Sequence, residues 1–313
     1  MGGYASTTWK AHKSTLRRFE QCVYEHVGRD VALSLVTPEV VSRYIDAFRP
    51  PRCSPSTFNN YRQYLVQFFE HCRAEGWIGA DPMRYVQPTR VRRRLRLQLT
   101  AAECVRMIES AEPRDRIALA LGINTALRAS DIMRLRVGDV DLDEGFIRAE
   151  IAKTATEDRL PITADLDEEL RRWFEHYTEA MQSTDGVMAG WHLVPVRHFQ
   201  AFDVWHPEFG GRVVYLPHRR YKHPHEIVQR GLTSIGYPTR GEGFHTLRRT
   251  SGRLVHRIAL RQGDEDPIRI VQSLLGHQSQ ATTERYLALG PERLARDRLL
   301  RGQRLLSHTG DSG

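Results

Sequence analysis

Residues 275–286 read Leu-Gly-His-Gln-Ser-Gln-Ala-Thr-Thr-Glu-Arg-Tyr, and this stretch places two reactive side chains around a helix boundary. Gly276 predicts the end of a helix, because glycine readily adopts the left-handed conformation that closes helix C-termini. A new helix is expected to start at Thr-Thr-Glu and to carry Tyr286, nine residues after His277. A tyrosine hydroxyl can attack phosphorus and leave a phosphodiester in place of the broken one. Taken singly, Tyr286 could equally be a core or surface residue.

Two further stretches supply arginines. Residues 125–131, Thr-Ala-Leu-Arg-Ala-Ser-Asp, put Arg128 at a predicted corner between helices, with Asp131 positioned to hold its guanidinium. In His-Thr-Leu-Arg, His245 and Arg248 are three residues apart and share one helix face. Arginine offers a bidentate fork to phosphate oxygens, and histidine can move a proton near neutral pH. The simpler alternative for Arg128 is an ordinary cation at a helix end. For His245 and Arg248 it is an exposed helix face without a bound phosphate.

Lysine is rare in this chain. Of the 46 basic residues only four are lysines: Lys10, Lys13, Lys153 and Lys222. Arginine stays protonated up to a pKa of ~12 or more, whereas lysine, at ~10.4, can be shifted and can donate a proton. Lys153, at the end of a predicted strand, is therefore a candidate general acid. The alternative is that Lys153 is at this position by chance. Lys222 is a second candidate for the general acid, but fewer features of its surrounding sequence support it.

The net charge of +8 is unevenly spread. Residues 1–100 hold 16 basic and 8 acidic side chains, whereas residues 101–313 hold 30 of each. A GC-rich genome would explain arginine over lysine but not this confinement, so a nucleic-acid or other anionic partner is favoured. Five arginines crowd the connector at residues 87–100: Arg90, Arg92, Arg93, Arg94 and Arg96. We expect this run to follow a phosphate backbone; a solvated linker is the alternative.

Helical signals fill the first part of the chain. Thr37-Pro38 and Ser54-Pro55 each combine a hydroxyl N-cap with proline at the first helical position. An earlier helix is predicted over residues 7–27 from apolar side chains at helical spacing: Trp9, Leu16, Phe19 and Val23. These signals predict an all-helical domain over residues 1–88, followed by a basic interdomain linker over residues 89–99.

A second domain is predicted from residue 100 to residue 290, opened by a capping box of Thr100 and Glu103. Its elements are expected to mix helices with one β-hairpin, while residues 184–222 have no assignable order. The expected helices and strands are a helix at 115–124, a helix at 129–137, strands at 145–153 and 158–162 separated by Thr-Ala-Thr-Glu, a helix at 165–182 and helices from 223 to about 306.

Several classes of protein are excluded. No apolar run approaches the ~20 residues of a membrane span, and the N-terminus lacks the apolar region of a secretory signal. The four cysteines form no metal-binding pattern and are expected to be reduced, buried thiols: Cys22, Cys53, Cys72 and Cys104. A cytoplasmic protein is therefore expected.

Taken in chain order, the motifs are residues 125–131, Lys153 on its predicted strand, His245 to Arg248, and residues 275–286. Together they resemble the catalytic domain of the tyrosine recombinase (phage integrase) family over about residues 97–290. That family has an arginine in a Gly-Leu-Arg-x-Ser-Glu block, a lysine on a β-hairpin, a His-x-x-Arg box and a Leu-Gly-His box ending in the nucleophilic tyrosine. The resemblance implies a mainly α fold, with a helical core-binding (SAM-like) domain and a mixed α+β catalytic domain containing a small antiparallel sheet. Two departures are Asp131, where glutamate is usual, and Ala126, where glycine is typical.

The resemblance also implies a role for each motif residue. Tyr286 would attack the scissile phosphate to form a 3′-phosphotyrosyl bond, and Lys153 would protonate the leaving 5′ oxygen. Arg128 and Arg248 would stabilise the charge on the phosphate, so neither a metal nor another cofactor is implied. The proton-transfer and phosphate-binding roles would fall to two histidines, His245 and His277 respectively.

The function implied is site-specific DNA recombination, for integration or excision of a phage or other mobile element, by a nucleoid-associated protein of a bacterial or archaeal cell. The alternatives are a Xer-like resolvase of chromosome or plasmid dimers, a type IB topoisomerase-like enzyme and a non-catalytic DNA-binding protein. The implied partners are two double-stranded DNA sites, a homotetramer on DNA and an accessory directionality factor; a membrane partner is not expected. With the first helix starting by residue 7, we expect a compact form without an arm-binding domain.

The C-terminal residues 291–313 include the leucine-rich stretch Pro-Glu-Arg-Leu-Ala-Arg-Asp-Arg-Leu-Leu-Arg-Gly-Gln-Arg-Leu-Leu. An apolar stripe on this predicted helix could dock within its own subunit or on a neighbouring one. The sequence leaves these two alternatives open.

Overall fold

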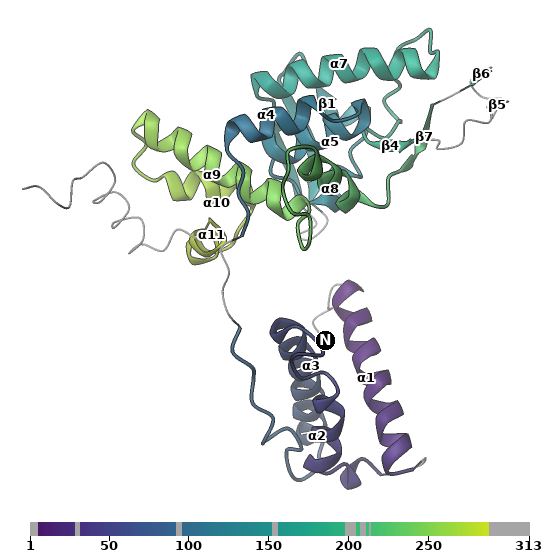
Figure 1. The fold of residues 1–313 in the computed structure, drawn as a ribbon, viewed down its shortest axis with the longest axis vertical. Coiled ribbons are helices and arrows are strands. Elements are labelled where there is room, and N and C mark those ends of the chain that lie inside the picture. Colours follow the sequence, from purple (N-terminus) through teal and green to yellow (C-terminus); the bar gives the residue numbers. More distant parts are fainter. Residues whose placement is uncertain are drawn as a thin grey trace, which may run out of the picture. The chain divides into compact units, whose positions relative to one another are not determined.

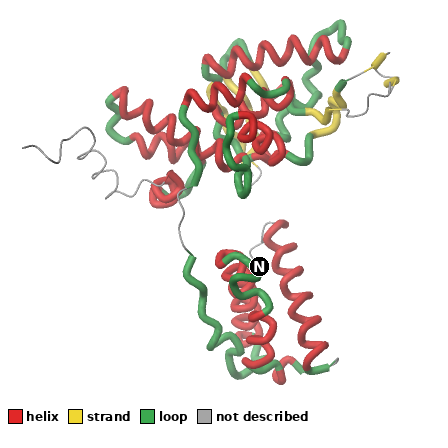
Figure 2. The backbone as a smooth tube through the Cα atoms, viewed as in Figure 1, coloured by secondary structure: helices red, strands yellow, loops and turns green. Residues whose placement is uncertain are grey.

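The computed structural model describes residues 6–28, 32–91, 96–151, 156–197, 205–206, 211–212 and 214–287. The chain divides into two compact units, Met1–Arg94 and Leu95–Gly313 (Figure 1). Helices dominate both units, and among the described residues the strands belong to the second (Figure 2). The mainly α fold with small antiparallel sheets is thus confirmed. None of the helices in these ranges has the length and apolar content that a membrane span needs.

The first unit packs three helices around one apolar core. They are α1 (Ser6–His26), α2 (Pro38–Asp46) and α3 (Pro55–Ala74), with a 3-10 turn at Leu33–Leu35. Ser54 caps α3 as predicted, since its side chain accepts a 3.1 Å hydrogen bond from the Thr57 amide. The core is rich in aromatic side chains, which include Phe19, Tyr44, Phe58 and Phe69. Trp9 is exposed, so its predicted place in the helix's apolar stripe does not bury it.

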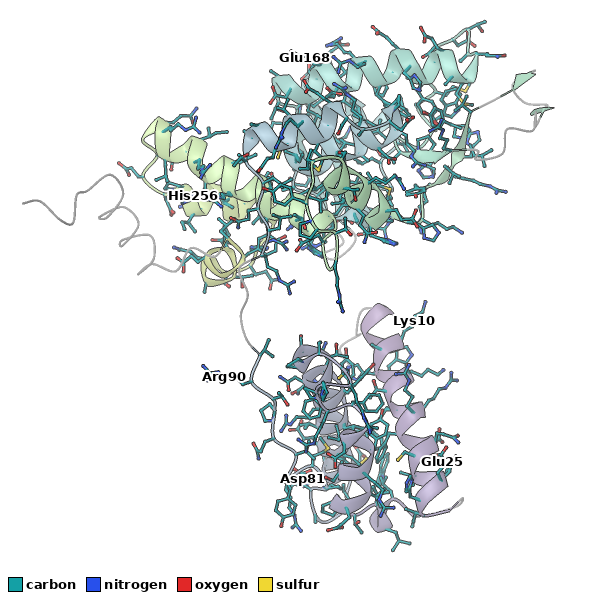
Figure 3. The ribbon with its side chains drawn as sticks, in the orientation of Figure 1. Lys10, Glu25, Asp81, Arg90, Glu168 and His256 are labelled. Atoms are coloured by element: carbon teal, nitrogen blue, oxygen red, sulfur yellow. The ribbon has the colours of Figure 1, made fainter. Side chains whose placement is uncertain are left out.

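Charged side chains lie on the outer surface of the first unit, beside exposed apolar residues such as Trp9 and Trp77. Lys10 and Glu25 are exposed near opposite ends of α1 (Figure 3). This separation of an apolar core from a charged surface is what an amphipathic helix produces when only one of its faces is buried.

The second unit is organised around α5, which is buried along almost its entire length. Helices α4, α7, α8 and α9 all contact it. A helix that is apolar on every side must be enclosed by others, and this explains its central place. The helices of this unit are α4 (Ala101–Glu109), α5 (Pro113–Asn124), α6 (Ala129–Ile132), α7 (Ala164–Met181), α8 (Pro224–Ser234), α9 (Phe244–Gln262), α10 (Pro267–Leu275) and α11 (Gln280–Leu287). The predicted capping box of Thr100 and Glu103 opens α4.

A three-stranded antiparallel sheet contains the predicted hairpin. Its strands are β1 (Val140–Asp141), β2 (Phe146–Ile151) and β3 (Thr156–Pro161), in that order. β3 begins at Thr156, so Thr156 and Glu157 belong to this strand and not to the predicted Thr-Ala-Thr-Glu connection. In the sheet Ile151 pairs with Thr156, and Glu150 pairs with Glu157. Residues 152–155, which include Lys153, lie outside the described residues.

The predicted helix at 129–137 is too long, because α6 ends at Ile132. The chain beyond it pairs instead with the region that the sequence left unassigned: the Val137 amide donates to the Trp191 carbonyl at 2.9 Å. Trp191 is fully buried and anchors this region. The region then forms two short antiparallel pairs: β4 (Pro195–Arg197) with β7 (Tyr215–Arg220), and β5 (Trp205–His206) with β6 (Gly211–Arg212).

Two other expectations need correction. All four cysteines are free thiols, but only Cys72 and Cys104 are buried, whereas Cys22 and Cys53 are half-buried. The helix that carries Tyr286 starts at Gln280 rather than at Thr-Thr-Glu, because the Ser279 hydroxyl accepts a 3.3 Å hydrogen bond from the Thr282 amide and so caps an earlier turn. Residues 288–313, which include the predicted C-terminal helix, lie outside the described residues.

Candidate active site

Arg248 connects two of the sequence motifs to a third. It lies on the first turns of α9 with only 5% of its surface exposed. One end of its guanidinium donates to the backbone carbonyl of Ala126, and the other donates to the carbonyl of Leu275. The Leu275 carbonyl is at the C-terminus of α10, where the negative end of the helix dipole favours a cation. A single buried side chain therefore holds the α5–α6 corner, the His-x-x-Arg box and the Leu-Gly-His box together.

Ala126 occupies an unusual backbone conformation at this corner. Its φ is 54°, in the left-handed region, and its side chain is fully buried. A residue other than glycine is disfavoured by about 1–2 kcal/mol in the left-handed conformation. This explains why glycine is typical at this position in the family that the sequence resembles. The conformation turns the Ala126 carbonyl toward Arg248, so the strain is compensated by a charge-assisted hydrogen bond.

Arg128 follows at the N-cap of α6, with 23% of its side chain exposed. Its guanidinium lies 4.0 Å from the carboxylate of Asp131, which is almost fully buried. The predicted pairing is therefore present as an ion pair but is too long for a hydrogen bond. Within the described residues, the carboxylate oxygen Oδ2 that faces Arg128 has no hydrogen-bond partner. Arg128 is thus oriented by Asp131 while its own donors can still reach an incoming anion.

Tyr286 lies near the end of α11, beside both histidines. Its hydroxyl donates a 3.1 Å hydrogen bond to the backbone carbonyl of His245. The His277 ring meets the Tyr286 ring edge-to-face, with 5.3 Å between the centroids. The Nδ1 atom of His277 is 3.0 Å from the Thr283 hydroxyl, which orients the imidazole. Gly276 ends α10 in the left-handed conformation, as predicted, and lets the chain turn into this arrangement.

The surroundings shift three pKa values in this cluster. Burial lowers the pKa of Arg248 to about 10, and the charge of Arg128 adds to this effect. Desolvation and the neighbouring guanidiniums lower the pKa of His245, which favours the neutral imidazole. Desolvation raises the pKa of the Tyr286 hydroxyl, although the same arginines oppose it. The result is a protonated tyrosine, a histidine suited to accept a proton, and a strong positive potential.

The remaining predicted residues are placed as follows. Arg90 and Arg96 are exposed, at the two described edges of the basic run. Arg92, Arg93 and Arg94 lie outside the described residues. Within the described ranges, no group of three or more His, Cys, Asp and Glu side chains is arranged to hold a metal ion.

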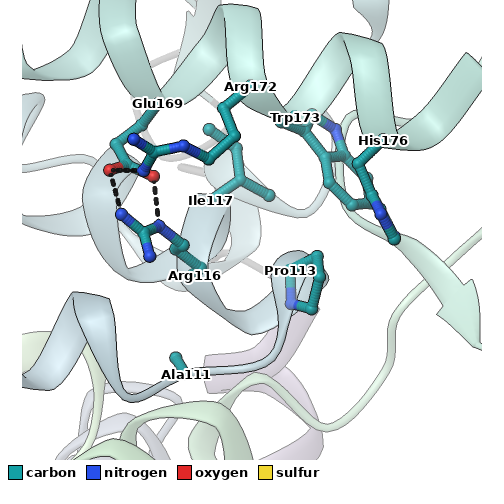
Figure 4. Close-up of a pocket in the computed structure, with 8 residues that line it drawn as sticks. All are labelled: Ala111, Pro113, Arg116, Ile117, Glu169, Arg172, Trp173 and His176. Carbon is teal, nitrogen blue, oxygen red and sulfur yellow. Dashed lines mark hydrogen bonds and ion pairs between the residues drawn. The ribbon is translucent and has the colours of Figure 1, made fainter.

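Two cavities of the second unit differ in their relation to these residues. One, of about 440 Å³, is lined by Asp131 of α6 together with charged residues of the segment that follows α6 and of β2 and β3. The other, of about 240 Å³, lies between α5 and α7 and contains none of the candidate residues (Figure 4). There Glu169 accepts two hydrogen bonds from Arg116, at 2.6 and 2.7 Å. Arg172 also donates to Glu169 at 2.9 Å, so this carboxylate is shared by the two arginines of the second cavity.

Sequence reasoning missed a polar network beside Arg248. Arg249 is nearly buried and pairs with Glu242 at 2.9 Å, and it also donates to the Leu97 carbonyl at 3.3 Å. Thr250, fully buried, accepts a 3.0 Å hydrogen bond from the Leu99 amide. The sequence does contain a signal for this network, which is the mostly polar run over residues 245–251. These side chains point to all sides of a helix, so one solvent-exposed face cannot place all of them in water. Such a run indicates a helix buried in hydrogen-bonding partners.

Comparisons with known proteins agree with this architecture. The family model described as "Phage integrase family" matches residues 98–293. A "Tyrosine recombinase XerC" from Thermodesulfovibrio yellowstonii is 25% identical over 290 residues, covering 91% of this chain and 86% of the relative. Lambda integrase (residues 75–356) bound to DNA superposes with a TM-score of 0.64 at 18% identity, covering 97% of this chain and 94% of that one.

A lambda integrase tetramer bound to a Holliday junction superposes with a TM-score of 0.62 at 18% identity, covering 91% of this chain and 72% of that one. At these identities the structural likeness concerns the fold. The family model, in contrast, spans well over half of the chain and includes every motif discussed above. The chain therefore belongs to the phage integrase family, the tyrosine recombinases, which are enzymes that transfer DNA strands.

Proposed function

We propose that this chain is a site-specific recombinase that integrates or excises a mobile element, with Tyr286 as its nucleophile. The observation that carries this proposal is the double hydrogen bond of Arg248 to the carbonyls of Ala126 and Leu275. These bonds link the segments that carry the arginine, histidine and tyrosine motifs, which supports a shared phosphate site. An electrostatic site of this kind stabilises charge where it develops in the transition state.

The proposed reaction proceeds in two balanced steps. The Tyr286 hydroxyl loses its proton to His245 as its oxygen bonds to phosphorus, and the bond from phosphorus to the 5′ oxygen breaks. Lys153 gives a proton to that leaving oxygen, which departs as a hydroxyl. In the second step the 5′ hydroxyl of the partner duplex loses its proton to Lys153 as its oxygen bonds to phosphorus. The bond from phosphorus to the Tyr286 oxygen breaks, and His245 returns its proton to that oxygen, so tyrosine leaves as a hydroxyl. Arg128, Arg248 and His277 hold the non-bridging oxygens throughout.

The proposed partners are two double-stranded DNA sites and three further copies of this chain. The tetrameric lambda integrase complex supports this assembly, because its fold matches over most of the chain. The exposed Arg90 and Arg96 support backbone contacts from the basic run. An accessory directionality factor is part of the same proposal, as is a place of action in the cytoplasm with the DNA.

A second candidate function is Xer-like resolution of chromosome or plasmid dimers. It is favoured by the XerC relative, whose similarity extends over 91% of this chain. The two functions differ in their DNA partners, since resolution joins two copies of one site whereas integration joins two different sites. Recombination assays with purified protein on paired candidate sites separate them.

The direct test uses a nicked suicide substrate that traps a covalent protein–DNA adduct. The parent protein is expected to form the adduct, and Tyr286→Phe is expected to form none while still binding DNA. Tyr85→Phe, at an exposed tyrosine of the first unit, is the matched control and should react as the parent does. An adduct that persists in Tyr286→Phe would exclude Tyr286 as the nucleophile.

A further inference from the structure

The segment Leu97–Leu99 crosses one face of α9 and reaches the helix that carries Tyr286. Leu97 accepts from Arg249 at 3.3 Å, and Leu99 donates to Thr250 at 3.0 Å. Arg249, Thr250 and Arg253 are spaced along α9 so that they share this face. Between the two leucines, Gln98 makes two side-chain hydrogen bonds that point in different directions.

One of these bonds ties Gln98 to α9 and the other to α11. The Gln98 Oε1 atom accepts from Arg253 at 2.9 Å. Its Nε2 atom donates to the backbone carbonyl of Leu287 at 3.2 Å. Leu287 directly follows Tyr286 on α11. Gln98 therefore ties the helix that carries Tyr286 to a connector residue 189 positions away in sequence.

The Leu287 side chain is held at the same point. It is buried, and it packs where α9 has Gly252. A methyl group at Gly252 would come within 2.9 Å of the Leu287 Cδ2 atom and within 3.2 Å of Val271. Glycine therefore opens the notch into which Leu287 fits. Leu287 is thus held by its side chain in a notch and by its carbonyl on Gln98.

These contacts matter because Tyr286 and Leu287 are neighbours on α11, so contacts that hold Leu287 also restrain the backbone of Tyr286. We propose that Gln98 is a positioning residue that, through the Leu287 carbonyl, sets the place of Tyr286 for attack on phosphate. The proposal rests on the proposed role of Tyr286. It joins the N-terminal edge of the second unit, next to the exposed Arg96, to the nucleophile.

The test separates the two hydrogen bonds of Gln98. Gln98→Ala removes both. Gln98→Glu keeps an acceptor for Arg253 but replaces the donor to the Leu287 carbonyl with a carboxylate oxygen. Arg253→Met removes the Arg253 bond alone and is the matched control. For each protein we would measure the single-turnover rate of adduct formation at saturating DNA, the Kd for DNA, the Tm and amide hydrogen exchange in residues 280–287.

Both Gln98 variants are expected to form the adduct about tenfold more slowly, with Kd and Tm unchanged and exchange in α11 faster. Arg253→Met should stay within about twofold of the parent rate. Parent-like rates in both Gln98 variants would overturn the proposal, as would an equal loss in Arg253→Met. If the parent forms no adduct, the proposed function fails, and exchange in α11 alone then decides: faster exchange in Gln98→Ala supports positioning and unchanged exchange overturns it.

Discussion

The hydroxyl of Tyr286 donates a hydrogen bond to the backbone carbonyl of His245, with 3.1 Å between the two oxygens. This bond holds the ring against the first turn of α9. A backbone carbonyl accepts a hydrogen bond but does not take up the proton, so attack on phosphate requires a separate base. The raised pKa of Tyr286 makes that base more important, because very little of the hydroxyl ionises unaided near neutral pH.

His245 is expected to be the base. Its pKa is lowered from 6.5, so the imidazole remains neutral at neutral pH and is protonated only at lower pH. The cleavage rate should therefore hold as pH falls to 6.5 and decline below it. His245→Gln should reduce the rate by about 10²–10⁴-fold and remove the acidic decline.

The measurement is the pH profile of single-turnover adduct formation. His71→Gln, at an exposed histidine of the first unit, is the control and should keep both the rate and the profile. An acidic decline that is unchanged in His245→Gln would assign the base elsewhere.

Ala126 should tolerate only small side chains. At a φ of 54°, a β-branched residue is strongly disfavoured, so Ala126→Val should lower the free energy of unfolding by about 2 kcal/mol or more. Ala126→Gly should stay within about 1 kcal/mol of the parent, because relief of strain offsets the lost methyl packing. Chemical denaturation measures both changes. Equal stability of the valine and glycine variants would contradict the strained corner.

Arg90 and Arg96 should contribute to DNA affinity without sequence preference. Each exposed guanidinium that neutralises one phosphate releases counterions, so Arg90→Gln or Arg96→Gln should reduce the slope of log Kd against log salt by about 1. Mobility-shift titrations at several salt concentrations measure this slope. Arg171→Gln is the matched control, since Arg171 already pairs with Asp167 at 2.7 Å and should leave the slope unchanged. If Arg90→Gln and Arg96→Gln both keep the salt slope of the parent protein, the basic run is a solvated linker that does not contact DNA.

His256 should make the protein less stable in acid. It is buried on α9, and desolvation lowers its pKa from 6.5. Below that value the unfolded chain binds the proton and the folded chain resists it, so stability declines as pH falls. His256→Leu should reduce the loss of unfolding free energy between about pH 7 and about pH 5. His225→Leu, at an exposed site, should not; equal losses in both would exclude His256 as the cause.

The sequence predicted those features that depend on neighbours along the chain. The Gly276 helix end, the Thr100–Glu103 capping box and the Ser54 cap follow from local backbone chemistry, and all three are present. The α6 helix was predicted too long because its end is imposed from outside, by the pairing of Val137 with Trp191. Local propensity contains no information about a partner so far along the chain.

The candidate site shows the same division. Its motif residues could be identified from spacing, whereas the contact of Gln98 with Leu287 could not. These residues are 189 positions apart, and a glutamine in a connector belongs to no recognisable pattern. The unassigned region 184–222 was also beyond prediction, since its order comes from buried Trp191 and from strands of which three, β4, β5 and β6, have only two or three residues. Such short strands have too few residues to display alternation.

The two hydrogen bonds of Arg248 also constrain how this protein can evolve. Phenylalanine at position 286 would give up a single bond to the His245 carbonyl, worth about 1 kcal/mol, and leave the scaffold in place. Loss of Arg248 would leave the Ala126 and Leu275 carbonyls without their donor and separate three segments. A descendant that abandons cleavage but keeps its grip on DNA therefore has an open route through the tyrosine. Arg248 would then be retained after cleavage activity is lost. Its presence in a homologue therefore does not prove that the homologue is an active enzyme.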